Sequence, residues 1–162
     1  MRTATVSLAG SYNRKGKVMS TKIYVGGTFD CFHRGHVNLL KNAKETADYV
    51  IVALNGDDFA SSYKNKPVMN EIERLEVIMS CRYVDMSFIM ESHSLQKKYI
   101  EIINPDYILH GNDWTGDSLV NQLGISQEFL DEHGIKMYYV PYTIGISTSD
   151  IKERIINEDS DI

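Results

Sequence analysis

Residues 22–40, KIYVGGTFDCFHRGHVNLL, change character part-way along. Lys22 to Val25 form a short apolar run typical of a buried strand, and the two glycines that follow indicate a sharp turn. From Gly35 onward the apolar residues fall at spacings that suit one face of a helix. Free amides and aligned peptide dipoles favour an anion at a helix N-terminus that follows a strand and a tight turn. The stretch therefore predicts a phosphate site.

His33 and His36 lie at this junction, separated by two residues. Both side chains can face one ligand if the helix begins between them. A metal site is the weaker alternative, because HxGH differs from HExxH and lacks a carboxylate or cysteine at suitable spacing. The GxGxxG pattern of dinucleotide-binding proteins is absent, which argues against a dehydrogenase. Phosphate chemistry is the favoured interpretation.

The composition fits one globular domain. The 162 residues are 43% hydrophobic and 24% charged, which is enough for a sizeable core. The formal net charge of -5 argues against a nucleic-acid surface. Neither Cys31 nor Cys81 lies in a CxxC pattern, and no apolar run approaches the ~18 residues that a membrane span needs. We therefore expect a cytoplasmic protein with no nucleic-acid partner and no membrane insertion.

The first 20 residues differ from the rest of the chain. They contain four basic residues, no acidic residue and no sustained periodicity. A mitochondrial presequence shares this composition, but the helical amphipathicity is poor. We expect a flexible tail over residues 1–20, a single domain over 21–158 and a short C-terminal tail over 159–162.

Strand-like apolar runs alternate with helical patterns along the domain. Strands are predicted over 49–54, 84–90, 106–110 and 136–141, and helices over 70–81, 94–103, 118–132 and 147–157. The continuous run YVIVAL at 49–54 is typical of a strand buried on both faces of a parallel sheet. We predict an α/β fold with an open, doubly wound, five-stranded parallel sheet. Its ligand crevice should lie beyond the carboxyl ends of the strands.

The segment 55–69 is long for a connection inside such a unit. Long loops are often lids or binding loops. Lys64 and Lys66 in this segment could bring ammonium groups over a ligand, or they could form a solvated pair on the surface. The residues alone favour the solvated pair.

Four motifs resemble those of the HxGH nucleotidyltransferases, specifically the cytidylyltransferase branch. GTFDCFHRGH (27–36) is similar to the GTFDxxHxGH signature, and KNKPVMNEIERLEVIMSCRYVD (64–85) to a lysine loop before a helix that ends in RYVD. HGND (110–113) and YTIGISTSDIKERI (142–155) resemble an HGND or GDDW element and a RTxGISTT element. The resemblance implies a Rossmann-like fold, and a homodimer with Arg82 to Asp85 near the contact.

The resemblance also implies roles for individual residues. His33, His36 and Lys64 are the expected catalytic residues. The expected nucleotide-binding residues are Gly27, Thr28, Phe29, Asp30, Gly35, Arg74, Gly111, Asn112, Asp113, Gly145, Ile146, Ser147 and Thr148. Trp114 and Tyr142 are the expected acceptor-binding residues. Plain structural roles are also open, since Ser147 and Thr148 are good helix caps and Trp114 could cap the edge of the core.

The implied reaction joins CTP to a small phosphorylated alcohol and releases pyrophosphate, with Mg²⁺ arriving with CTP. Glycerol 3-phosphate, phosphocholine and phosphoethanolamine all remain open as acceptors. Tyr142 replaces the usual arginine, and Asn112 stands where several relatives have aspartate. The tyrosine also resembles domains associated with phosphonate pathways, so a phosphonate acceptor is an alternative. An ATP-using adenylyltransferase of the same fold and a non-enzymatic nucleotide sensor are the others.

Overall fold

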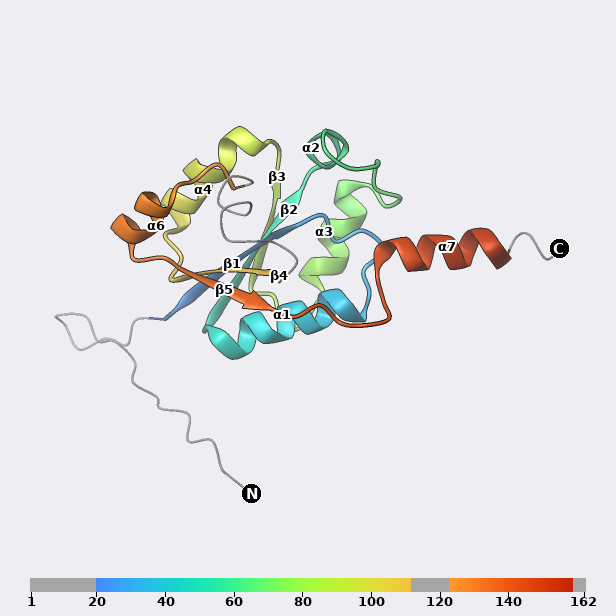
Figure 1. Cartoon of the computed structure of the whole chain (residues 1–162), viewed down its shortest axis with the longest axis horizontal. Coiled ribbons are helices and arrows are strands. Elements are labelled where there is room, and N and C mark those ends of the chain that lie inside the picture. Colours follow the sequence, from blue (N-terminus) through green and yellow to red (C-terminus); the bar gives the residue numbers. More distant parts are fainter. Residues whose placement is uncertain (1–19, 112–122, 159–162) are drawn as a thin grey trace, which may run out of the picture.

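One five-stranded parallel sheet forms the centre of a single α/β domain in this computed structural model (Figure 1). The strands lie in the order β3-β2-β1-β4-β5, and each neighbouring pair is parallel. They are β1 (Lys22–Gly27), β2 (Tyr49–Asn55), β3 (Met86–Met90), β4 (Tyr107–Gly111) and β5 (Lys136–Val140). The structure describes residues 20–111 and 123–158. Apart from Ser20, the two predicted tails fall outside these ranges.

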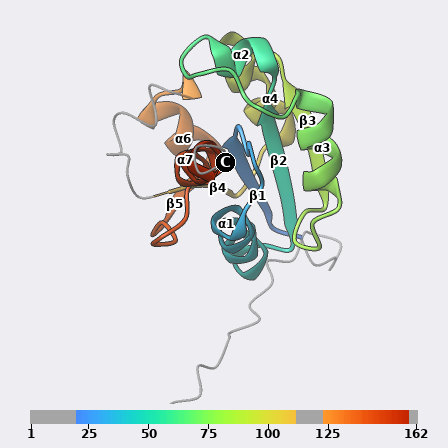
Figure 2. The same cartoon turned by 90° about the vertical axis from the view of Figure 1, so that its right-hand side faces the viewer.

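Helices cover both faces of the sheet (Figure 2). They are α1 (Arg34–Thr46), α2 (Asp57–Ser61), α3 (Glu71–Met79), α4 (Gln96–Ile103), α6 (Gln127–His133) and α7 (Thr148–Glu158), with a 3₁₀ turn at His93–Leu95. Leu40 of α1 and Ile78 of α3 join a buried cluster on one face, and Ile100 of α4 and Leu130 of α6 join the cluster on the other. None of the described helices has the length and apolar content to cross a membrane.

β1 is the central strand of the sheet. From β1 the chain continues through β2 and β3 on one side, and then returns to lay β4 and β5 on the other. Its side chains alternate between the faces: Ile23 and Val25 lie in one core cluster and Tyr24 in the other. Between β1 and β4 the strand order reverses, which is where open α/β sheets bind ligands. The predicted doubly wound, Rossmann-like sheet is confirmed.

The predicted strands agree closely with the structure where apolar runs are continuous. Every residue of β2 except Tyr49 is buried, as expected for a strand covered on both faces. Helix α3 begins directly after Asn70, whose side chain accepts hydrogen bonds from two first-turn amides, while the Glu73 carboxylate accepts one from the Asn70 amide. Local capping chemistry therefore sets this boundary.

Two predicted segments differ from the structure. Of the helix expected over 118–132, residues 118–122 lie outside the described residues, and in the rest α6 begins only after Ser126. Gly124 has a left-handed φ of 65°, and Ser126 caps α6 by accepting a hydrogen bond from Phe129 N. The loop expected over 55–69 contains the short helix α2. Its first-turn carboxylates, Asp57 and Asp58, favour a helix start, a signal that the polar character of the segment hides.

Helix α7 has a different relation to the core. It extends away from the sheet toward the C-terminus (Figure 1), and none of its residues is fully buried. Its position therefore depends on its first turns, which lie at the carboxyl ends of the strands.

Candidate active site

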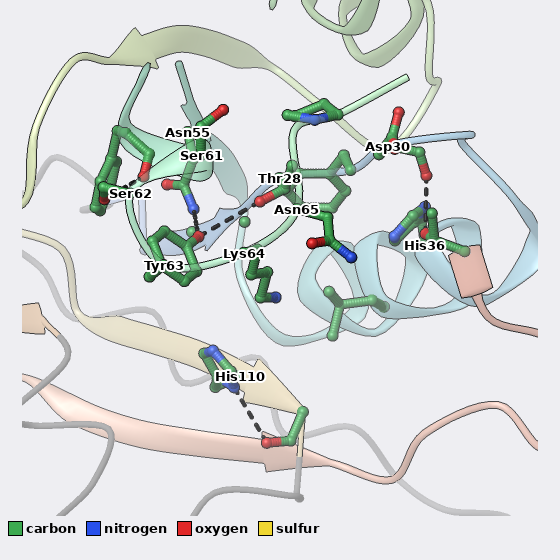
Figure 3. A pocket seen from close by; sticks show the side chains of 18 of the residues that line it. Thr28, Asp30, His36, Asn55, Ser61, Ser62, Tyr63, Lys64, Asn65 and His110 are labelled. Carbon is green, nitrogen blue, oxygen red and sulfur yellow. Dashed lines mark hydrogen bonds between the residues drawn. The ribbon is translucent and has the colours of Figure 1, made fainter. Parts of the chain in front are cut away.

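A cavity of about 940 Å³ opens at the carboxyl ends of β1, β2 and β4. Figure 3 shows part of its wall. Its lining residues are Gly26, Gly27, Thr28, Phe29, Asp30, His36, Leu39, Asn55, Phe59, Ser61, Ser62, Tyr63, Lys64, Asn65, Pro67, Gln96, Ile108, Leu109, His110, Gly111, Leu123, Tyr142, Thr148, Ser149 and Lys152. The cavity therefore lies at the reversal of strand order, where the sequence predicts a crevice.

The turn after β1 brings Asp30 into the protein. Phe29 and Cys31, on either side of it, have positive φ values of 53° and 48°, and Asp30 is 5% exposed. Its carboxylate accepts hydrogen bonds from the amides of Val68 and Met69. The Lys152 ammonium lies 2.8 Å from Asp30 Oδ2, so one carboxylate joins the β1 turn to the end of the lysine loop and to α7.

The pKa of Asp30 reflects two opposing effects. Burial raises the pKa of the carboxyl, but the hydrogen bond from Lys152 and the two backbone amides outweigh burial and lower it below its ordinary value. Asp30 is therefore an anion in the folded protein, already surrounded by donors.

His33 and His36 cap the start of α1 with their own rings. Gly35 N donates to His33 Nδ1 at 3.1 Å, and His33 N donates to His36 Nδ1 at 3.3 Å. A neutral imidazole whose Nδ1 accepts carries its proton on Nε2. The rings stack with their centroids 3.8 Å apart. The capping contacts thus leave each ring with an Nε2–H donor.

Both histidines are held neutral by their surroundings. Burial, followed by the neighbouring His33, lowers the pKa of His36 to about 3. Burial also lowers the pKa of His33, against the opposing charge of Asp150. The pair can donate hydrogen bonds without bringing positive charge of its own.

Gly35 is required by the close approach of the His33 ring. A Cβ at this position would lie 2.9 Å from His33 Cε1, a distance that real Cβ atoms essentially never show. The glycine between the histidines therefore permits the His33 ring to fold back over the helix start.

The start of α7 meets the same site from the other end of the chain. Thr148 Oγ1 donates to the carbonyl oxygen of Asp30 at 3.0 Å and lies 3.5 Å from His33 Nε2. Ser147 Oγ accepts from Asp150 N and so caps the first turn. Ile144 and Gly145 form the turn that leads through Ile146 to the helix, and Gly145 has a φ of 76°. The predicted capping role of Ser147 is therefore present.

Lys64 lines the cavity beside Tyr63. Lys64 Nζ lies 5.6 Å from the centroid of the Tyr63 ring, and Tyr63 Oη lies 2.6 Å from Asn55 Nδ2 (Figure 3). Lys66 does not line the cavity. Of the two lysines in the loop, Lys64 therefore lies at the site and Lys66 does not.

Arg74 lies behind the cavity wall and does not line the cavity. It is 1% exposed, and its guanidinium donates to the carbonyl oxygens of Thr28, Asn55 and Met69 and to Asp57 Oδ1. Arginine offers five N–H donors, and the backbone takes most of them here. The structure thus corrects the expected orientation toward the nucleotide: Arg74 ties the exits of β1 and β2 together from beneath.

Tyr142 packs its ring against the end of β4. A Cβ on Gly111 would lie 2.6 Å from Tyr142 Cζ, so a larger residue at 111 would displace the ring from this position. Tyr142 is 56% exposed and lines the cavity. It stands at the edge of the cavity, between β4 and the loop that leads to α7.

A family model described as cytidylyltransferase-like matches residues 24–154. The chain belongs to the cytidylyltransferase-like family. This confirms the expected family, and with it an enzyme of the nucleotidyltransferase class. All the geometry described above lies within the matched residues.

This cytidylyltransferase-like chain is similar to one relative over nearly all of that protein and to another over only part of it. It is 37% identical to the glycerol-3-phosphate cytidylyltransferase of Bacillus subtilis, over 83% of this chain and 96% of that protein. It is 30% identical to the ethanolamine-phosphate cytidylyltransferase of Dictyostelium discoideum, over 83% of this chain but only 36% of that protein. The chain thus spans about a third of the length of the second relative.

The chain is also similar to a relative with a different name and to a solved structure. The FAD synthase of Pyrococcus horikoshii is 33% identical over 86% of this chain and 95% of that protein. Among solved structures, a lipopolysaccharide core biosynthesis protein from Thermoplasma volcanium aligns with a TM-score of 0.63 and 26% identity. That alignment covers 77% of this chain and 98% of the other. The cytidylyltransferase-like chain therefore shares its fold with this solved structure.

The structure brings most of the predicted site residues of this family member together, but not all. Gly27, Thr28, Phe29, Asp30, His36, Lys64, Gly111, Tyr142 and Thr148 line the cavity. His33, Gly35, Gly145, Ile146 and Ser147 lie next to it, in the turns that carry those residues. The predicted positions Asn112, Asp113 and Trp114 lie outside the described residues.

The lining residues that were not predicted for this site include Tyr63, Gln96, His110 and Lys152. Lys152 had a usable signal, because it lies four positions after Thr148 and so on the same face of the predicted helix. His110 had a weaker signal, since it is the last residue of the strand predicted over 106–110. Gln96 had none, because it lies within the helix predicted over 94–103. Tyr63 had none, because its hydroxyl contacts depend on tertiary folding.

Metal ligands are not clustered in the part of this chain that the structure describes. No group of three or more His, Cys, Asp and Glu side chains there could hold a metal ion. Asp30, the carboxylate in the cavity lining, is engaged by Lys152 and two amides. The described residues therefore do not fit a resident magnesium site.

Proposed function

We propose that residues 21–158 form a CTP-dependent cytidylyltransferase that acts on a small phosphorylated alcohol. The observation that carries this proposal is the pair of neutral, stacked histidines, with His36 in the same cavity wall as Lys64 and Thr148. Neutral Nε2–H donors suit an anionic phosphoryl group whose charge redistributes during transfer. The named glycerol-phosphate and ethanolamine-phosphate relatives support this substrate class.

The proposed reaction is a direct displacement. A phosphate oxygen of the acceptor forms a bond to the α-phosphorus of CTP, and the bond to the bridging oxygen of the leaving pyrophosphate breaks. The acceptor oxygen is already ionised, so no general base is required. The protein contributes positioning and charge: His33 and His36 donate to α-phosphate oxygens, and Lys64 adds an ammonium.

The ends of two helices add to the proposed phosphate site. α1 begins at the histidines and α7 begins at Thr148, so amides of both first turns lie near the cavity. Their dipoles favour an anion. We propose that magnesium enters as the complex with CTP, as part of the substrate, since the described residues do not form a site for it.

One assay tests the proposal. The protein is mixed with CTP, magnesium and, in separate reactions, glycerol 3-phosphate, phosphocholine or phosphoethanolamine, and both the CDP-alcohol and pyrophosphate are measured. We expect one acceptor to yield both products in equal amounts. Pyrophosphate release without a CDP-alcohol in every reaction would contradict the proposal.

An ATP-using adenylyltransferase is the second candidate, because the similarity to the FAD synthase extends over 95% of that protein. Repeating the assay with ATP in place of CTP, and with FMN among the acceptors, separates the two. Product from ATP but not from CTP would replace the first assignment with the second.

We propose in addition that the protein is a homodimer. A shallow groove on the α1 and α3 side of the molecule is lined by Phe32, Val37, Val77, Ser80, Cys81, Arg82 and Tyr83. These residues include part of the segment that resembles a dimer contact. Light scattering after size exclusion should give twice the 18.4 kDa of one chain. A Val77→Glu variant should shift the mass toward one chain.

A further inference from the structure

The Tyr63 hydroxyl spans the ends of two neighbouring strands. Asn55 Nδ2, at the last residue of β2, donates to Tyr63 Oη at 2.6 Å, and Thr28 Oγ1, just after β1, lies 3.4 Å from the same oxygen. Figure 3 shows Tyr63 between these two side chains. Asn55 is paired with Met90 in the sheet, and Thr28 directly follows Gly27, the last paired residue of β1, so both partners are held at the end of the sheet.

The ring of Tyr63 also contacts the cation of the site. Lys64 Nζ lies 5.6 Å from the ring centroid, within the range of a cation–π interaction. The ring also packs near Phe59 of α2, with the ring centroids 5.4 Å apart. The ring is therefore fixed by its hydroxyl and by α2, and it in turn limits where the ammonium can lie.

The lysine loop is attached to the domain a second time, after Lys64 in the chain. The amides of Val68 and Met69 donate to the buried Asp30 carboxylate. Only residues 64–67 lie between Tyr63 and this second attachment, and Pro67 fixes one backbone angle of that short span. Protein groups on both sides therefore hold the segment that carries Lys64, which differs from a lid that nucleotide alone would order.

We propose that Tyr63 is a positioning residue of the active site: its hydroxyl fastens the lysine loop to β1 and β2, and its ring holds the Lys64 ammonium over the cavity. Tyr63 acts through Lys64 and takes no part in bond making. The proposal rests on the proposed function in one respect, namely that Lys64 contacts the phosphates of CTP.

Two substitutions separate the hydroxyl from the ring. Tyr63→Phe keeps the ring and removes the contacts to Asn55 and Thr28, whereas Tyr63→Leu removes both. We expect Tyr63→Phe to lower kcat about tenfold, the effect of one lost hydrogen bond on a group needed in the transition state. Tyr63→Leu should lower it about a further threefold through loss of the ring contact. Tyr49→Phe is the matched control, because Tyr49 is 40% exposed and Tyr63 41%.

A double-mutant cycle distinguishes positioning from general loss of stability. If Tyr63 acts through Lys64, Tyr63→Phe should cause no further loss of kcat in a Lys64→Ala background. Fully additive losses would overturn the proposal. So would a wild-type kcat in Tyr63→Phe.

Tryptic cleavage of the Lys64–Asn65 bond gives a readout that needs no substrate. The bond after Lys66 is followed by proline and resists trypsin, so cleavage in this span reports on Lys64. We expect Tyr63→Phe to be cut at this bond about tenfold faster than wild type and Tyr49→Phe. Equal rates would refute the fastening. If wild type transfers no nucleotide to any acceptor, the proposed function fails, and the tryptic comparison alone then decides the role of Tyr63.

Discussion

At the scale of single residues, His36 links helix capping to the proposed chemistry. Its Nδ1 accepts the His33 amide, which directs Nε2–H away from the helix start. We expect His36→Ala to lower kcat by roughly 10² to 10³, the usual effect of losing a preorganised donor. Loss of the cap should cost about 1 kcal/mol of stability, so the fold should persist. Steady-state kinetics and circular dichroism measure the two effects.

The control for this prediction is His133→Ala, because His133 lies in the last turn of α6 and does not line the cavity. It should retain wild-type kcat. A His36→Ala enzyme with more than about a third of the wild-type rate would remove His36 from the catalytic residues.

Tyr142 is the residue where this chain departs from the arginine of the motif it resembles. The ring packs on Gly111 at the cavity edge and offers a flat face and one hydroxyl, whereas arginine would offer a permanent charge. We expect Tyr142→Arg to raise the KM of the acceptor, most of all for a cationic head group, through charge repulsion and loss of ring contact. Separate KM values for CTP and three acceptors test this. A lower KM for CTP with unchanged acceptor KM values would instead assign position 142 to the nucleotide.

Residues could be predicted from the sequence where the chemistry is local. His33, Gly35 and His36 act on one another within four positions, and the motif was sufficient to find them. Arg74 and Tyr63 were harder, because both contact Thr28, which follows β1 and lies 46 and 35 positions away in the chain. The Arg74 guanidinium was expected at the nucleotide but donates to three backbone carbonyl groups, so residue type and spacing did not predict where this side chain binds.

At the scale of elements, α7 is attached to the domain through its first turns. Thr148 contacts the Asp30 carbonyl and Lys152 contacts the Asp30 carboxylate, while no residue of the helix is fully buried. We expect Lys152→Ala to loosen α7 without unfolding the sheet. Amide hydrogen exchange should then increase along α7 and stay unchanged in β1 and β2.

Lys41→Ala is the control for this helix. Lys41 pairs with Glu45 one turn along α1, but both side chains are more than half exposed and the atoms are 3.9 Å apart. Such a surface pair contributes little to stability. Exchange in α7 that stays at the wild-type level in Lys152→Ala would mean that Thr148 alone anchors the helix.

Helices and strands could be predicted where a single sequence feature, such as an apolar run or a helix cap, determined the structure. The buried run of β2 and the capping residues of α3 left little choice of structure. The region after β4 was harder, since helical spacing continued through Gly124 while the backbone turned there. The polar segment 55–69 likewise hid α2, because Phe59 and Ala60 bury against the sheet only after the strands have formed.

At the scale of the whole molecule, the buried histidines make stability depend on pH. The pKa of His36 lies at about 3 in the fold against an ordinary value of 6.5. Between these values the unfolded chain binds a proton that the folded chain does not, so the free energy of unfolding falls as pH falls. The contribution is complete above about pH 6.5. On going down to pH 5, His36 alone should lower the free energy of unfolding by about 2 kcal/mol.

Denaturant titrations at pH 7.5 and 5.0 measure this loss. We expect His36→Gln to reduce the difference between the two conditions, whereas the exposed His133→Gln should leave it unchanged. Asp30 does not interfere, because its pKa is lowered from 3.8 and its effect falls at still lower pH. An equal pH dependence in wild type and His36→Gln would contradict the assignment.

The contact between Thr148 and Asp30 joins positions 118 residues apart. During synthesis from the N-terminus, β1, β2 and β3 emerge early and can pair, but β4 must still insert beside β1, and the first turns of α7 arrive last. A nascent chain can therefore hold half a sheet with His33 and His36 already in place and yet lack the part of the cavity wall that β4 and the start of α7 supply. The wall of the cavity is therefore complete only once the start of α7 has been synthesised and has reached Asp30.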